Sequence, residues 1–169
     1  MEFIIYASLT ANGRVILAQQ ENYQTPVEIL KDCMELAWGT GNMVIGSNTF
    51  NLFMSIPGAG EGLKGLELIV LSKRTDSFEG VTFLPDAESI IEYLGKKGQN
   101  KILILGGVQT YHSFINKGYV NELYLNYNPI LTSTGEELLD LTDHDLDLEL
   151  LGTKVITSDI FQLHWLVKK

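Results

Sequence analysis

Hydrophobic and polar positions along the chain alternate between short apolar runs and longer segments with helical spacing. Runs rich in valine, isoleucine and leucine predict strands at residues 2–9, 42–45, 66–71, 81–84 and 101–105. Between them, helical patterns and capping residues predict helices at residues 25–38, 48–53, 86–97 and 109–116. Strands and helices in alternation are typical of a parallel sheet with helices on both faces.

The pattern changes after residue 118. Three long strand patterns follow, at residues 120–127, 146–156 and 160–167, with no helical pattern between them. Ser158 and Asp159 stand where a hairpin turn is expected. We therefore predict an α/β fold with a mostly parallel central sheet, flanking helices and antiparallel C-terminal strands. A chain of 169 residues is expected to form a single domain, here residues 1–169.

Charge and composition narrow the class of partner. The chain carries a net charge of −9, whereas binding to a nucleic-acid backbone needs clustered lysine and arginine. No apolar run approaches the roughly 20 residues of a membrane span, and the N-terminal segment lacks the basic start of a signal peptide. The single Cys33 excludes an internal disulfide. We expect a cytoplasmic protein that binds a small molecule and neither nucleic acid nor membrane.

The most informative local feature is the pair Gly106-Gly107 between the predicted strand 101–105 and the helix after it. Glycines let the backbone approach a ligand closely, and the N–H groups at a helix start favour an anion. Many such junctions are only tight turns. Two further strand ends, at residues 46–49 (Gly-Ser-Asn-Thr) and 71–74 (Leu-Ser-Lys-Arg), are also polar. Ligands of parallel sheets bind beyond such strand ends.

These three strand ends, together with residues 8–15 (Ser-Leu-Thr-Ala-Asn-Gly-Arg-Val), resemble the dihydrofolate reductase superfamily. The segment 118–131, which begins Gly-Tyr-Val-Asn-Glu-Leu and ends Pro-Ile-Leu, is similar to the riboflavin-type branch of that superfamily. That branch includes the reductase domain of the bifunctional deaminase–reductase of riboflavin biosynthesis. The resemblance spans nearly the whole chain. It implies NADPH as cofactor and hydride transfer to a small pterin-, pyrimidine- or ribosylamino-type substrate.

The resemblance also implies which residues contact the cofactor. The loop after the first strand would lie beside the nicotinamide, the two glycine turns would hold phosphates, and the Leu-Ser-Lys strand end would meet the 2′-phosphate. The implied cofactor-binding residues are Thr10, Asn12, Gly13, Gly46, Thr49, Ser72, Lys73, Gly106, Gly107, Val108, Thr110 and Tyr111. Plainer alternatives stay open: a hairpin turn at Asn12-Gly13, a helix cap at Thr49 and core packing of Tyr111.

Two departures from the superfamily pattern bear on the ligands. Ser47 stands where an arginine usually supports the cofactor phosphates, which leaves the choice between NADPH and NADH open. Lys73 and Arg74 are the cations that would compensate. Leu66 follows Gly65 where folate reductases carry an arginine for the glutamate tail of the substrate. Dihydrofolate is therefore a poor fit, and a smaller or differently charged heterocycle is expected.

The candidate catalytic acids are Glu28 and Asp32, which are four residues apart and so share one face of the predicted helix. Their plainer interpretation is a solvated helix face, with Glu28 complementing the helix dipole. No metal site is expected, because His112, His144 and His164 lack the spacing of zinc ligands. His112 is expected to face solvent and Cys33 to be a small buried hydrophobe.

The sequence alone leaves several further interpretations and alternatives open. The acidic run at residues 136–149 is interpreted as a solvated loop followed by the outer face of a strand. A homodimer through the long C-terminal strands is a hypothesis. The rival functions are a true folate reductase and a non-catalytic nucleotide-binding protein of the same fold. A structural protein without any ligand ranks last, because it leaves three polar strand ends unexplained.

Overall fold

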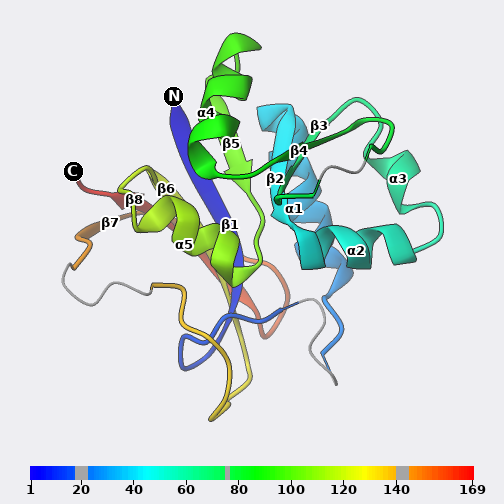
Figure 1. Cartoon of the computed structure of the whole chain (residues 1–169). Helices are drawn as coiled ribbons and strands as arrows, with labels where there is room; N and C mark the ends of the chain where they lie inside the picture. Colours follow the sequence, from blue (N-terminus) through cyan, green and yellow to red (C-terminus); the bar gives the residue numbers. More distant parts are fainter. Residues whose placement is uncertain (18–22, 75–76, 140–144) are drawn as a thin grey trace.

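The fold is built on one continuous sheet of eight strands (Figure 1). The computed structural model describes residues 1–17, 23–74, 77–139 and 145–169. The strands are β1 (Glu2–Thr10), β2 (Asn42–Gly46), β3 (Glu67–Leu71), β4 (Val81–Leu84), β5 (Lys101–Ile104), β6 (Glu122–Asn128), β7 (Leu148–Val155) and β8 (Phe161–Val167). Their order across the sheet is β4-β3-β2-β5-β1-β6-β8-β7.

The first six strands in the chain pair in parallel, whereas β8 is antiparallel to both β6 and β7. The predicted fold class, a mostly parallel sheet with antiparallel C-terminal strands, is therefore confirmed. The predicted hairpin turn at Ser158-Asp159 is also confirmed, because the backbone N–H groups of Ile156 and Thr157 donate to the carbonyl of Ile160 across it.

The helices are α1 (Val27–Thr40), α2 (Ser47–Ser55), α3 (Ala59–Gly62), α4 (Ala87–Lys96) and α5 (Val108–Ile115). As predicted, Asp86 caps α4: its carboxylate accepts from the backbone N–H of Ser89 at 2.8 Å. The start of α1 differs from the predicted start at residue 25. Pro26 itself occupies the N-cap position without a side-chain hydrogen bond, and the helix continues to Thr40 before Gly41 ends it with a φ of 76°. The short α3 had no sequence signal.

Two hydrophobic layers hold the sheet between helices (Figure 1). Successive side chains of a strand point to opposite faces, so Ile5 packs with α4 and α5, while Ile4 packs with α1 and α2. Strands buried on both faces need apolar side chains at nearly every position. That requirement explains why the central runs Asn42–Gly46 and Lys101–Ile104 lack polar alternation.

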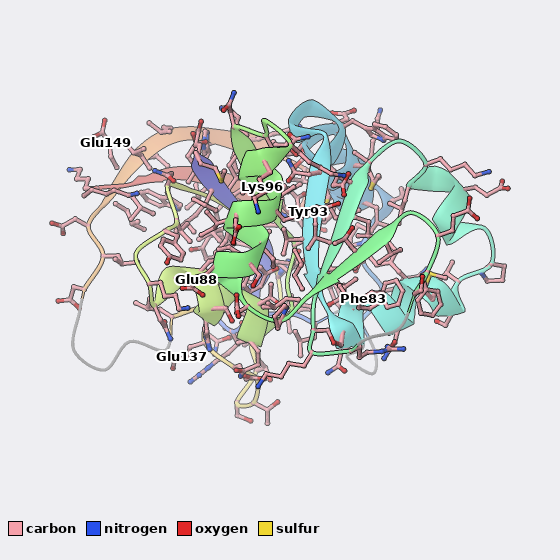
Figure 2. All side chains as sticks on the ribbon, turned by 45° about the horizontal axis from the view of Figure 1, so that its top comes forward. Phe83, Glu88, Tyr93, Lys96, Glu137 and Glu149 are labelled. Atoms are coloured by element: carbon pink, nitrogen blue, oxygen red, sulfur yellow. The ribbon has the colours of Figure 1, made fainter. Side chains whose placement is uncertain are left out.

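The edge strand β7 differs from its sequence prediction. The alternation of acids and leucines was expected to place carboxylates outside and leucines inside from residue 146. In the structure Asp145 and Asp147 precede the strand, and an irregularity between Leu150 and Gly152 breaks the alternation. Both Leu150 and Leu151 are about half exposed, at 49% and 47%. Figure 2 shows Glu149 of this strand at the outer margin of the molecule. Asp140, Asp143 and His144 lie outside the described residues.

Candidate active site

The topology opens a crevice at the carboxyl ends of two neighbouring strands. From β1 the chain passes through α1 on one face of the sheet to β2, whereas from β5 it passes through α5 on the other face to β6. Because β1 and β5 are adjacent, the helices that follow them leave in opposite directions. In open α/β sheets this switch point is where ligands bind.

A cavity of about 410 Å³ lies at this end of the sheet. The junctions of β2 with α2 and of β5 with α5 form most of its wall. Five of the residues that the sequence analysis singled out are brought together there: Gly46, Thr49, Gly107, Val108 and Thr110. The other lining residues are Leu17, Ser47, Asn48, Leu52, Leu71, Gln109, Ser113 and Glu136.

Close contacts explain the glycines at positions 46 and 106, of which Gly46 lines the cavity and Gly106 does not. The N–H of Gly46 donates to the carbonyl of Gly106 at 2.6 Å, and a Cβ on Gly46 would lie 2.7 Å from the Thr110 hydroxyl oxygen. Gly106 has a φ of +102°, and a Cβ there would lie 2.6 Å from the Tyr111 hydroxyl oxygen. The peptide bond between Gly106 and Gly107 is cis. A side chain at position 46 would therefore separate the two strand ends, and one at position 106 would displace Tyr111.

Gly107 has a different role in the wall of the cavity. A Cβ added there would meet only Leu17, at 3.7 Å, and its φ of −71° suits any residue. The missing side chain therefore leaves space in the cavity rather than within the protein core. A glycine that keeps such a space open is a fit for a bulky phosphate group of a dinucleotide held against the backbone.

The electrostatics of this cavity come from neutral donors. The first N–H groups of α2 and α5 have no acceptor within their own helix and carry the positive end of the helix dipole. Side-chain hydroxyls of Ser47, Thr49, Thr110 and Ser113 add to them. Among the described lining residues no lysine or arginine is present, and Glu136 supplies a carboxylate. An anion here would be held by backbone N–H groups instead of by ion pairs.

A second, inner cavity of about 140 Å³ continues from the first, with which it shares Leu17, Thr49 and Gly107. Its wall combines apolar groups of β1, α1 and α2 with a few hydroxyls. The remaining lining residues are Tyr6, Ser8, Val15, Ile16, Tyr23, Thr25, Ile29, Leu30, Cys33, Phe53, Leu105 and Tyr111. Together the two cavities form a crevice with a polar outer part and a more apolar inner part.

Tyr111 combines the two interpretations that the sequence left open. It is buried in the core, its hydroxyl donates to the Tyr6 carbonyl at 2.9 Å, and the residue also lines the inner cavity.

The prediction that His112 faces solvent is wrong. His112 is only 8% exposed, and its Nε2 lies 3.0 Å from the carbonyl oxygen of Glu137. The loop that returns across α5 covers this histidine, and the local helical pattern carries no sign of that loop.

The loop after β1 has the geometry of a tight turn. The Thr10 hydroxyl donates to Asn12 Oδ1 at 2.9 Å and accepts the N–H of Arg14 at 3.0 Å, while Gly13 has a φ of +83°. Asn12 Nδ2 donates to the carbonyl of Thr132 at 2.8 Å. None of Thr10, Asn12 and Gly13 is among the residues that line the described cavities. They position the following residues 15–17, which do line them. Their contact with a cofactor stays a prediction.

The strand end of β3 contributes Leu71 to the outer cavity, while Ser72 and Lys73 lie beyond its wall. Ser72 Oγ accepts the N–H of Arg74 at 3.2 Å, and the Arg74 guanidinium donates to Asn51 Oδ1 at 2.9 Å. That guanidinium also lies over the ring of Phe83, which is labelled in Figure 2. Lys73 is exposed. The two cations of this motif thus stand at the margin of the cavity next to Leu71.

The two candidate acids are not equivalent in the structure. Glu28 is exposed. The Asp32 carboxylate is mostly buried, at 13% exposure, and accepts hydrogen bonds from the Tyr6 hydroxyl at 2.9 Å, from Gln162 at 2.7 Å and from Lys154. Burial alone would raise the pKa of Asp32, but these donors hold it below its usual value. Neither acid is among the lining residues of the described cavities, so their role as substrate ligands stays a prediction.

The Asp32 network predicts a pH-dependent contribution to stability. We expect Asp32→Asn to lower the free energy of unfolding at pH 7 by about 1–3 kcal/mol, because it weakens the bonds from Tyr6, Gln162 and Lys154. A carboxylate with a depressed folded pKa stabilises the protein above its unfolded pKa and loses that contribution in acid. The difference from the wild type should therefore shrink as the pH falls below about 4.

Urea unfolding of both proteins between pH 7 and pH 3 measures this effect. Glu149→Gln, a change to an exposed acid on β7 (Figure 2), is the matched control and should leave the unfolding free energy nearly unchanged. A constant difference between Asp32→Asn and wild type across this range would contradict the assignment.

Sequence reasoning missed several wall residues because their side chains come from distant segments. The alternation of side chains along β1 could have identified Tyr6 and Ser8. Residues two apart in a strand point to the same face of the sheet, and for these two it is the face that α1 covers. Leu105 directly precedes Gly106 and was placed in a strand, not in a site. Tyr23 and Glu136 had no local signal, because only the tertiary structure brings their loops to the crevice.

Residues 42–162 match the model of the RibD C-terminal domain. The chain belongs to this family. The resemblance to the riboflavin-type branch of the dihydrofolate reductase-like proteins is thereby confirmed. The match contains both glycine-lined helix starts and the β3 strand end, whereas β1 and α1 precede it.

Three known proteins are similar to this chain in sequence or in fold. The uncharacterized protein YyaP of Bacillus subtilis (strain 168) is 28% identical over 83 residues, which cover 46% of this chain and 44% of that protein. A putative riboflavin biosynthesis protein from Shewanella sp. PV-4 superposes over 100% of both chains with a TM-score of 0.75 and 21% identity. RibD from Acinetobacter baumannii covers 99% of this chain but only 58% of its own, with a TM-score of 0.77 and 14% identity. At these identities the two structures share the fold.

Two properties of residues 1–17, 23–74, 77–139 and 145–169 bear on the class of ligand. In that part of the chain no group of three or more histidine, cysteine, aspartate or glutamate side chains converges as a metal site would require. None of its helices has the length and apolar character needed to cross a membrane.

Proposed function

We propose that this chain is an NADPH-dependent reductase that transfers a hydride to a C=N or C=O bond of a small heterocyclic substrate of pterin, pyrimidine or ribosylamino type. The observation that carries the proposal is the convergence of two glycine-lined helix starts on one cavity that continues into a second, more apolar one. Membership in the RibD C-terminal domain family supports a reductase.

The residues of the outer cavity fit a nicotinamide dinucleotide. Gly46 and Thr49 at the start of α2, and Gly107, Val108 and Thr110 at the start of α5, would hold its phosphates through backbone N–H groups and hydroxyls. Lys73 would meet the 2′-phosphate that distinguishes NADPH from NADH. When bound, the cofactor supplies the hydride, which the substrate carbon accepts while its nitrogen or oxygen takes a proton. Apolar wall residues such as Leu17 and Leu105 exclude water from the reacting atoms.

Calorimetric titration with NADPH and with NADH tests the cofactor. We expect Lys73→Ala to weaken NADPH binding about tenfold and to leave NADH binding unchanged, because only NADPH carries the 2′-phosphate. Lys64→Ala, which removes an exposed lysine paired with Glu61, is the matched control for charge. Absence of binding to either dinucleotide at millimolar concentration would refute the reductase. Binding without turnover of any pteridine or pyrimidine would favour the non-catalytic nucleotide-binding alternative.

We also propose that two copies of the chain associate through β7. This edge strand carries the half-exposed Leu150 and Leu151, and an antiparallel pair of edge strands is self-complementary about a twofold axis. Sedimentation velocity at micromolar concentration should show a dimer, and Leu150→Lys should shift it to monomer. A wild-type protein that sediments only as monomer would contradict the proposal.

A further inference from the structure

One acid stands in the wall of the outer cavity. Glu136 is the only charged side chain among the described lining residues of that cavity, and its own side chain is exposed. Its Oε2 lies 3.5 Å from the side-chain Nε2 of Gln109, in the first turn of α5. A carboxylate accepts hydrogen bonds and donates none, so its partners in a ligand are hydroxyl and N–H groups. The N–H groups of the helix starts suit phosphates, whereas this side chain suits a different part of the same ligand.

The loop that carries Glu136 is fixed on two sides. The carbonyl of Glu136 accepts the N–H of Val15 at 2.9 Å. The next residue, Glu137 (Figure 2), pairs with the Arg14 guanidinium at 2.7 Å, and its carbonyl oxygen lies 3.0 Å from Nε2 of His112 on α5. The loop after β1 and the helix α5 therefore hold the backbone that presents the Glu136 carboxylate to the cavity.

The order of the strands places Glu136 on a definite side of the outer cavity. The carboxyl ends of β3, β2, β5 and β1 lie side by side in that order at one edge of the sheet. Leu71, at the end of β3, lines the cavity on one side of the helix starts of α2 and α5. Glu136 lines it on the other side, next to the loop that follows β1. A dinucleotide with its phosphates on the two helix starts would therefore extend toward Leu71 with one half and toward Glu136 with the other.

The inner cavity identifies the half that lies beside Glu136. Val15, whose N–H bonds to the Glu136 carbonyl, lines the inner cavity, and Leu17 lines both cavities. In the proposed function the reacting atoms lie there, while Lys73 beyond the end of β3 meets the 2′-phosphate of the adenosine half. The half beside Glu136 is then the nicotinamide riboside. Its ribose has two neighbouring free hydroxyl groups, and one carboxylate can accept from both.

We propose that the Glu136 carboxylate accepts hydrogen bonds from the 2′- and 3′-hydroxyl groups of the nicotinamide ribose. This inference rests on the proposed function, because it takes the outer cavity as the dinucleotide site. Other dinucleotide-binding folds also place an acid on a ribose hydroxyl. In this chain Glu136 binds the sugar that stands between the phosphates and the nicotinamide ring, and it thereby sets the direction in which the cofactor lies across the sheet edge.

Calorimetry on the full chain tests the proposal with three ligands: NADPH, NADH and adenosine 2′,5′-bisphosphate. Glu136→Ala removes the carboxylate at an exposed position, so folding should be unaffected. We expect the variant to bind NADPH and NADH about tenfold more weakly than the wild type, by the same factor for both, because each loses hydrogen bonds to a charged acceptor. The bisphosphate lacks the nicotinamide ribose, so its binding should be unchanged or tighter. Glu136→Gln keeps one acceptor oxygen and should lie between the wild type and Glu136→Ala.

The sign of the effect separates the proposal from a purely electrostatic role. An acid that only faces solvent repels every anionic ligand, so its loss would tighten the binding of NADPH and of the bisphosphate alike. That result, or equal affinities in Glu136→Ala and wild type, would overturn the proposal. Weaker binding of NADH alone would also overturn it, because it would place the carboxylate on the adenosine ribose, whose 2′-hydroxyl is free only in NADH.

Two controls complete the experiment. Glu92→Ala removes an exposed acid of α4 outside both cavities and should leave all three affinities unchanged. Circular dichroism should show each variant folded. Failure of the wild type itself to bind all three ligands would be a failure of the proposed function, and the inference would fall with it. Binding by the wild type that Glu136→Ala does not weaken would refute the inference and leave the proposed function intact.

Discussion

Replacement of Gly107 by aspartate is expected to weaken NADPH binding by at least about 100-fold, which corresponds to about 2.7 kcal/mol. The new carboxylate would stand in the outer cavity, because a Cβ at this position meets only Leu17, at 3.7 Å. There it would occupy the space for a phosphate and repel it at short range, in a wall that contains no lysine or arginine among its described residues. Calorimetric titration with NADPH measures the loss.

Two controls separate the possible causes of that loss. Gly107→Asn adds a side chain of the same size without charge, so it should retain more affinity than Gly107→Asp if repulsion contributes. Gly39→Asp adds the same charge on α1, where a Cβ meets nothing within 4 Å and no described cavity is near, and it should bind NADPH normally. Circular dichroism and thermal unfolding should show all three variants folded. Wild-type affinity in Gly107→Asp would exclude this cavity as the phosphate site.

Replacement of Gly106 by alanine is expected to lower the free energy of unfolding by about 3 kcal/mol. Two costs add. The φ of +102° is unfavourable for a residue with a Cβ, by about 1–2 kcal/mol. The methyl group would also lie 2.6 Å from the Tyr111 hydroxyl oxygen and 2.8 Å from its ring carbon, and overpacking of this kind costs about 1–3 kcal/mol. Urea unfolding at pH 7 provides the measurement.

A double-mutant cycle with Tyr111→Phe tests the steric part of this argument. Loss of the hydroxyl removes the nearest contact, so the cost of Gly106→Ala should be smaller in the Tyr111→Phe background than in the wild type. Gly152→Ala on β7, where a Cβ meets nothing within 4 Å, should change stability by less than about 0.5 kcal/mol. Strict additivity of Gly106→Ala and Tyr111→Phe would show that the clash with the Tyr111 hydroxyl is not the cause.

Local signals in the sequence were sufficient for the strands, four of the helices and the glycine-lined part of the outer cavity. The central strands can be recognised in the sequence as continuous apolar runs, because a strand buried on both faces has no alternation of apolar and polar residues. The convergence of Gly46 with Gly106 and Gly107 followed from the general rule that carboxyl ends of parallel strands meet at one edge. The motif at residues 71–74 was placed correctly at the end of β3, although only Leu71 of it lines the cavity.

The sequence was less informative wherever a side chain depends on a partner distant in the chain. The pattern around Asp32 is that of an ordinary helix face, and only the return of β7 and β8 brings Lys154 and Gln162 to its carboxylate. His112 is likewise buried by the loop that carries Glu137. The wall of the inner cavity is also a tertiary property, since Tyr6, Leu30 and Phe53 come from three separate elements.

By itself, then, the sequence of this protein determined the order of its elements, the class of its sheet and the glycine-lined edge where a dinucleotide is proposed to bind. These follow from periodicity and from backbone conformation, which are local properties. The tertiary structure alone decided which side chains face the crevice and which acid is held within the fold. Those outcomes depend on contacts between segments that are distant in the chain, such as Asp32 with Gln162, and no local pattern encodes them.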